Sequence, residues 1–112
     1  MRPRIYVSGP ITIGDLQSNL RQAYAATQQL MRASFAVLCP HLTCHLPGHQ
    51  EFPHQAWIDN DLSWVEVAHA VLRLPGESTG ADAECEHAAS HGIPVYHSIE
   101  ELVDGFAEEL LR

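Results

Sequence analysis

Three polar segments each follow a short apolar run, and they carry the side chains that could do chemistry. Residues 8–12 follow the first run, where Gly9 would let the backbone turn, and a histidine-rich stretch follows the second. Residues 75–80 follow the third run. If the runs are parallel strands, their carboxyl ends lie at one edge of a sheet, where ligands bind. The sequence therefore predicts a polar pocket at that edge.

The segment after the third run carries the most informative chemistry. Ser78 and Gly80 open a predicted helix, and the free N–H groups at a helix N-terminus favour an anion such as phosphate. Glu84 follows one turn later, in a row of small residues that would let a ligand approach. A carboxylate there can act as a nucleophile or base, as in glycoside chemistry. The alternative is an exposed glutamate on an amphipathic helix.

A second carboxylate precedes the third apolar run, from either Asp59 or Asp61. Asp61 shares a helical stripe with Trp57 and Trp64. It could orient a sugar hydroxyl or pass a proton to a leaving base. For either aspartate alone, a solvated helix face is the alternative.

The histidine-rich loop between residues 40 and 54 allows a metal interpretation. His41, His45 and His49 are spaced four apart, with Cys39 and Cys44 nearby, and such a run could bind zinc. An intervening Leu-Pro-Gly sequence would break any helix that aligned the three, so the loop could instead line the pocket or lie on the surface. We therefore expect no metal ligands. The remaining histidines that share no pattern are His69, His87, His91 and His97.

The elements that must position these residues alternate along the chain. Strand-like apolar runs occupy residues 5–9, 35–39, 70–74 and 93–96, and helical patterns occupy 16–33, 55–67, 79–91 and a last stretch capped by Ser98. Alternation of this kind predicts a parallel sheet of four to five strands with helices on both faces. The expected fold is an α/β, flavodoxin-like three-layer sandwich with the first strand in the middle.

Composition limits the class of protein. A length of 112 residues predicts one domain spanning 1–112. The net charge is −8 and all six basic residues are arginines, which argues against a nucleic-acid groove. Three cysteines without paired spacing argue against a disulfide framework. No apolar stretch approaches membrane-spanning length and no signal peptide is evident, so we expect a cytoplasmic protein without a membrane partner.

Taken in order, four motifs resemble the nucleoside 2-deoxyribosyltransferase-like superfamily, which includes the deoxynucleoside 5′-monophosphate N-glycosidases. The motifs are residues 5–11, 61–65, 70–84 and 92–95. Within that superfamily the chain is most similar to a short branch described as a domain of unknown function. The segment Ser-x-Gly-x-x-x-Glu after an apolar strand is the specific part of the resemblance.

The resemblance implies a role for each matching residue. Glu84 would be the nucleophile that attacks the anomeric carbon and forms a glycosyl-enzyme ester. Asp61 would assist that chemistry and contact the sugar or base. Ser78 and Gly80 would form the turn that binds a 5′-phosphate. The residues matching the loop that lines the sugar and base pocket are Tyr6, Ser8, Gly9 and Ile11.

The implied activity is cleavage or base exchange at the N-glycosidic bond of a (deoxy)nucleoside or its 5′-monophosphate. It needs no cofactor, takes a small-molecule partner, and is expected in a homo-oligomer whose neighbouring subunit completes the site. Glu77 and Asp82 place negative charge beside the anion turn, and Arg73 is expected not to reach it, so a free nucleoside stays open as substrate. The alternatives are a non-catalytic nucleotide-binding or sensing domain and a metal-binding protein using the histidine-rich loop.

Overall fold

The computed structural model describes residues 1–44 and 46–111 and contains one parallel sheet. Its strands are β1 (Arg4–Ser8), β2 (Ala36–Leu38), β3 (Ala70–Arg73) and β4 (Val95–Tyr96). Their order is β2-β1-β3-β4, and every pairing is parallel. The first strand therefore lies inside the sheet, as predicted, and β1 exchanges hydrogen bonds with a neighbour on each side.

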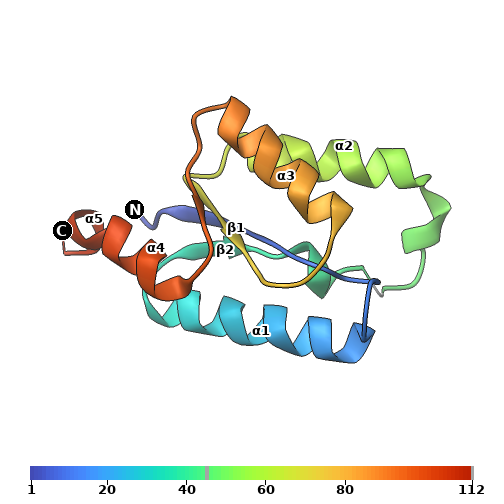
Figure 1. Cartoon of the computed structure of the whole chain (residues 1–112), viewed down its shortest axis with the longest axis horizontal. Helices are drawn as coiled ribbons and strands as arrows, with labels where there is room; N and C mark the ends of the chain where they lie inside the picture. The colour runs from blue at the N-terminus through green and yellow to red at the C-terminus, as the bar shows by residue number, and fades with distance from the viewer. Residues whose placement is uncertain (45, 112) are drawn as a thin grey trace.

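Helices cover both faces of the sheet, which confirms the predicted three-layer arrangement (Figure 1). They are α1 (Leu16–Arg32), α2 (His54–Val65), α3 (Thr79–Ser90), α4 (Ile99–Gly105) and α5 (Ala107–Leu110), with short 3-10 turns η1 (Pro40–Leu42) and η2 (His49–Glu51) between β2 and α2. α2 and α3 lie over one face, and α1 and α4 lie over the other. Among the residues described, no helix has the length and apolar character needed to cross a bilayer.

Successive side chains of β1 point to opposite faces of the sheet, so the strand contributes to a separate apolar cluster on each face. Ile5 and Val7 belong to the larger apolar cluster, which includes Leu30 of α1 and Leu102 of α4. Tyr6 points to the other face and belongs to a smaller cluster. The members of that smaller cluster are Tyr6, Val65, Val71 and Ala88. The face under α2 and α3 thus has the smaller apolar core.

Local signals begin and end the helices largely as predicted. The hydroxyls of Ser78 and Ser98 accept hydrogen bonds from amides three residues later, at the starts of α3 and α4. Gly92 has a φ of 71° and ends α3, the conformation that favours glycine after a helix. Asp15 occupies the N-cap position of α1 but makes no side-chain hydrogen bond there.

Two glycines let the loops after β1 and β3 approach each other closely. A Cβ at Gly9 would lie 2.9 Å from the Cβ of Leu74, and a Cβ at Gly76 would lie 2.9 Å from Pro10 Cγ. Gly76 also has a φ of 115°. Gly9 has no positive φ, so glycine is needed there for close approach and not for the sharp turn predicted from sequence. The contact brings two of the three polar segments together.

Candidate active site

A glutamate from α3 is anchored to the central strand by two hydroxyl groups. Tyr6 and Ser8 lie two residues apart on β1, so both face α3, and each is only 1% exposed. Ser8 Oγ donates to Glu84 Oε1 at 2.6 Å, and the Tyr6 hydroxyl donates to Glu84 Oε2 at 2.5 Å. Hydrogen bonds to an ionised carboxylate are strong, so they hold Glu84 in one orientation. The exposed-glutamate alternative is therefore wrong.

Small residues on α3 make this arrangement sterically feasible. Ala81 and Ala88 are buried against the sheet, and Glu84 lies between them on the same side of the helix. The short side chains let α3 approach β1 closely enough for the Glu84 carboxylate to reach both hydroxyls. Two members of the row of small residues thus pack the helix on the sheet.

Opposing influences act on the charge of Glu84. Burial raises the pKa of the Glu84 carboxyl, and the charge of Asp61 raises it further. The hydrogen bonds from Ser8 and Tyr6 and the charge of Arg73 lower it. Burial, followed by the charge of Glu84, raises the pKa of Tyr6 far above its ordinary value, so this phenol remains a donor. Burial prevails, so the pKa of Glu84 is raised overall. Once the proton is lost, fixed donors hold the desolvated anion in place, an arrangement that suits a nucleophile.

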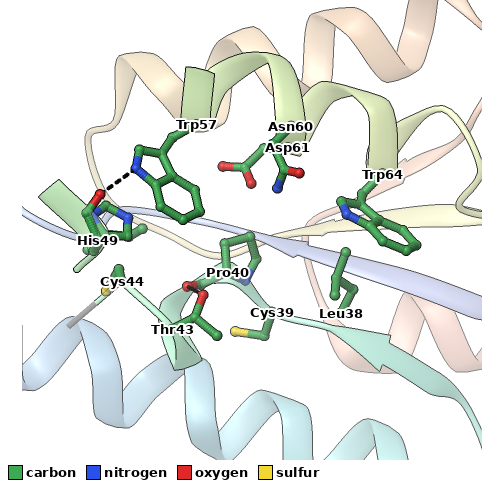
Figure 2. Close-up of a pocket in the computed structure, with 11 residues that line it drawn as sticks. Leu38, Cys39, Pro40, Thr43, Cys44, His49, Trp57, Asn60, Asp61 and Trp64 are labelled. Carbon is green, nitrogen blue, oxygen red and sulfur yellow. Dashed lines mark hydrogen bonds between the residues drawn. The ribbon is translucent and has the colours of Figure 1, made fainter. Parts of the chain in front are cut away.

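Asp61 lies beside this cluster and lines a cavity of about 120 Å³ (Figure 2). Trp57 and Trp64 of α2 line the same cavity, and Leu38 and Pro40 form part of the opposite wall. Burial raises the pKa of the Asp61 carboxyl, although a hydrogen bond from its neighbour Asn60 lowers it. The helical stripe predicted for Trp57, Asp61 and Trp64 is thus the cavity wall.

The spacing of residues alone did not decide between Asp59 and Asp61, and the structure places them differently. Asp59 is exposed and accepts a hydrogen bond from Gln55 Nε2 at 2.9 Å, one helical turn away. Asp61 is partly buried, and its charge acts on Glu84. Of the two aspartates, Asp61 is therefore the one that lies close enough to act on Glu84.

The histidine-rich loop contributes to the cavity wall, which confirms one of the alternatives for it. His49 stacks on Trp57 with ring centroids 4.1 Å apart, and its carbonyl accepts the Trp57 indole N–H at 2.8 Å. Cys44 also lines the cavity. His45 lies outside the described residues.

His41 has a different role, as a buried connector between loops. It is 2% exposed, and its Nε2 donates to the carbonyl of Pro10 at 3.0 Å. Its Nδ1 lies 3.6 Å from Cys39 Sγ. Burial lowers the pKa of His41, which keeps the ring neutral. Both ring nitrogens are occupied, so His41 does not fit the alternative in which the histidine run binds zinc.

The start of α3 offers backbone donors beside a cation. The amides of Thr79 and Gly80 make no hydrogen bond within the described chain, whereas Ser78 Oγ is occupied as the helix cap. A Cβ at Gly80 would meet no atom within 4 Å, so the space on the side-chain side of this residue is open. Arg73 was expected not to reach this turn. That expectation is wrong, because its guanidinium donates to the carbonyl of Gly76 at 2.9 Å and pairs with Asp82.

Apart from Gly9, which packs against Leu74, the predicted residues fall into three neighbouring groups. Tyr6, Ser8 and Glu84 form the hydrogen-bonded cluster, Asp61 and Ile11 line the cavity, and Ser78 and Gly80 begin α3. Glu84 itself does not line the cavity. Its link to the cavity is the electrostatic interaction with Asp61.

Comparison with known proteins places this arrangement among related folds. The model of a family described as "Domain of unknown function (DUF4406)" matches residues 3–97. A conserved protein from Enterococcus faecalis V583 is similar in structure, with a TM-score of 0.73 and 19% identity over 85% of this chain and 62% of that one. The chain thus spans less than two thirds of that protein's length. No curated protein matches the sequence significantly.

A second solved structure has a known activity. It is a 2-deoxyribosyltransferase from the psychrotolerant bacterium Bacillus psychrosaccharolyticus, with a TM-score of 0.67 and 21% identity. The similarity covers 86% of this chain and 75% of that enzyme. At this identity the likeness shows that the two chains share a fold.

Proposed function

The chain belongs to the DUF4406 family, and from that premise we propose that it cleaves the N-glycosidic bond of a (deoxy)nucleoside or its 5′-monophosphate. The observation that carries the proposal is the Glu84 carboxylate held between the hydroxyls of Tyr6 and Ser8. The fold likeness to a 2-deoxyribosyltransferase supports the substrate class. The base is either released to water or exchanged for another base.

The proposed reaction has two steps. One Glu84 oxygen bonds to the anomeric carbon as the bond to the base breaks, and the departing base keeps the electron pair and takes a proton. Charge at the sugar resembles an oxocarbenium ion, which a carboxylate stabilises before it forms the glycosyl ester. In the second step water or a second base attacks the same carbon, and the ester bond breaks to restore Glu84.

Asp61 is the proposed acid for the leaving base. Its raised pKa keeps a proton on the carboxyl at higher pH than an exposed aspartate would. The negative charge of Asp61 raises the pKa of Glu84, so an Asp61 that still holds its proton favours the anionic nucleophile. The indoles of Trp57 and Trp64 on the same wall supply apolar surface for a planar base.

The start of α3 is the proposed site for a 5′-phosphate. The amides of Thr79 and Gly80 have no hydrogen-bond acceptor in the described chain and could donate to an anion. Arg73 adds positive charge nearby. The negative charges of the exposed carboxylates Glu77 and Asp82 would disfavour phosphate binding there. Comparing a nucleoside with its 5′-monophosphate therefore measures which influence prevails.

A second copy of the chain is proposed to complete the site. The cavity of about 120 Å³ is well below the roughly 300–1,000 Å³ of pockets that enclose a drug-sized ligand. Trp64 is 51% exposed at its edge, and such an aromatic is a typical interface residue. Leu110, by contrast, packs against the apolar core.

The direct test is base release from a panel of deoxynucleosides, ribonucleosides and their 5′-monophosphates, with and without an acceptor base. We expect free base from the wild type and none from Glu84→Gln, because the amide keeps the shape and loses the nucleophile. Glu86→Gln, an exposed glutamate two residues along the same helix, is the matched control and should keep full activity. Acceptor dependence separates transferase from hydrolase.

A nucleotide-binding or sensing domain is the second candidate, because Glu84 does not line the cavity. It predicts saturable binding of a panel member with no base release from any variant. Equal base release by the wild type and Glu84→Gln would instead refute the proposed mechanism.

A further inference from the structure

Two histidines and a glutamate gather beyond the candidate active site, where α2 and α3 end. The residues are Glu66, His87 and His91, and one ligand atom from each lies within 4.8 Å of the others. His87 Nε2 is 2.7 Å from Glu66 Oε2. This cluster is separate from the one around Glu84, which bonds to β1. We propose that it is a binding site for a divalent transition-metal ion of the zinc class.

The donor set matches what such ions prefer. His87 and His91 are four residues apart, which places their rings one above the other on the helix, with centroids 4.5 Å apart. Two histidines at this spacing plus a carboxylate is a zinc-binding combination. Imidazole nitrogen favours zinc, nickel and copper over magnesium or calcium, which take oxygen ligands.

The ring of His91 is already oriented for metal binding. Its Nδ1 lies 3.0 Å from the carbonyl of His87 and 3.1 Å from Ser90 Oγ. The Ser90 hydroxyl already donates its proton to the His87 carbonyl at 2.7 Å, so Nδ1 acts as a donor and carries the proton. Nε2 is then left with a free lone pair. A backbone carbonyl that fixes the tautomer in this way is the usual companion of a metal-binding histidine.

Both helices direct partial negative charge at the cluster. Glu66 is the C-cap of α2 and His91 is the C-cap of α3, so each lies at the negative end of a helix dipole. A cation is stabilised at a helix C-terminus. Here two such ends meet with the Glu66 carboxylate.

Only small movements separate the present geometry from a bound one. Tetrahedral zinc with bonds of about 2.0–2.1 Å holds its ligand atoms about 3.4 Å apart. On binding, the distance of 2.7 Å between His87 Nε2 and Glu66 Oε2 must therefore increase. Any distance between ligand atoms that now exceeds about 3.4 Å, up to the limit of 4.8 Å, must decrease. Side chains of Glu66 and His87 that are 44% and 26% exposed can make such rotations. That exposure also leaves room for water to complete the coordination.

The consequence for the fold is a bridge between α2 and α3. These helices carry Asp61 and Glu84, the two carboxylates of the candidate active site. A metal bound to the native state alone stabilises that state in proportion to its occupancy. Zinc would therefore raise the thermal stability of the chain without touching the hydrogen bonds of Glu84.

The test is titration of the chelator-treated full chain with Zn²⁺ by calorimetry at pH 7.5, followed by Co²⁺ absorption spectroscopy. We expect one ion per chain, tetrahedral Co²⁺ bands, and a higher Tm with Zn²⁺. Each of His87→Ala, His91→Ala and Glu66→Gln should weaken binding at least tenfold. Glu66→Gln guards against a folding defect, because the amide preserves the side-chain volume.

The controls are His49→Ala in the histidine-rich loop and His97→Ala, an exposed histidine after β4. Both should bind Zn²⁺ as the wild type does. Tm values in excess chelator show whether each variant folds. Absence of binding to the wild type at 100-fold excess Zn²⁺ would overturn the proposal. So would unchanged affinity in the folded Glu66 and histidine variants, or loss of affinity in His49→Ala alone.

Discussion

The two faces of the sheet differ in what their buried side chains do. Under α1 and α4 the core is continuously apolar, with Ile5 and Val7 of the central strand packed on Leu30 and Leu102. Under α2 and α3 the same strand presents hydroxyl groups to a carboxylate. One face therefore stabilises the fold, while the other gives up apolar contacts to hold a carboxylate.

The difference arises from one strand with alternating side chains. Burying a carboxylate is costly unless hydrogen bonds compensate, and Tyr6 and Ser8 supply two of them to Glu84. The part of the burial cost that these hydrogen bonds do not cover lowers the stability of the chain. Hydrophobic surface buried on the apolar face can offset that loss. Substitutions on the two faces should therefore separate stability from activity.

The largest expected effect is on the chemistry of the carboxylate face. Asp61→Asn should lower kcat/KM about 10²–10⁴-fold, the usual contribution of a general acid, with little change in the fold. Asp59→Asn, on the exposed side of the same helix, should leave the rate within twofold of wild type. Steady-state base release measures both. Equal rates for Asp61→Asn and wild type would remove Asp61 from the mechanism.

The apolar face should show the opposite behaviour. Leu30→Ala removes a completely buried side chain of α1 and should lower the free energy of unfolding by about 2–5 kcal/mol. Because Leu30 lies on the far face from Glu84, kcat per folded molecule should be unchanged. Denaturant unfolding and activity at low temperature provide the two measurements. A large fall in kcat of the folded variant would show that the two faces are coupled.

Tyr6→Phe sharpens the comparison on the central strand itself. The phenyl ring keeps the buried volume, but Glu84 Oε2 loses its donor. A hydrogen bond to a charged group contributes about 1.5–3 kcal/mol, so we expect a rate loss of roughly 10- to 100-fold. Losing a donor to the anion also raises the pKa of Glu84, so the acid limb of the pH–rate profile should move to higher pH. An unmoved limb would contradict this role.

The smallest expected effect is on stability. In the native state the pKa of Glu84 is raised, so its carboxyl holds a proton more tightly than in the unfolded chain. The stability this provides is present below the unfolded pKa and is lost as pH rises through the folded pKa. Glu84→Gln, which never ionises, should therefore have a higher free energy of unfolding than the wild type at pH 8.

That stability difference should shrink as the pH falls towards 4, where the wild-type carboxyl is protonated as well. Thermal unfolding at several pH values measures it, and Glu86→Gln serves again as the exposed control. A variant less stable than wild type at pH 8 would mean that the hydrogen bonds of the anion outweigh its burial.

Much of the fold was predictable because local patterns carry it. Short apolar runs alternating with helical periodicity predicted four strands, and the structure places the first strand inside a parallel sheet as expected. Ser78, Ser98 and Gly92 marked helix ends through capping chemistry that depends only on nearby backbone groups.

The site was less predictable because its members meet across the sheet. Glu84 and Asp61 were identified through their position and a family resemblance, but the choice of Asp61 over Asp59 needed the packing of α2. The spacing of Tyr6 and Ser8 already places them on one face of a strand, and that signal could have paired them with Glu84. Nothing local predicted that Arg73 would bend back to the turn that starts α3.

The sequence by itself determined which elements form, where several helices begin and end, and which residue types are available for chemistry, because propensity and periodicity act over a few residues. Only the tertiary structure decided which glutamate is buried against hydroxyls and which lies beside two histidines. Glu84 and Glu66 are chemically identical, and the helices and strand packed around each one set its solvation and partners. Those long-range contacts determine how each carboxylate can act.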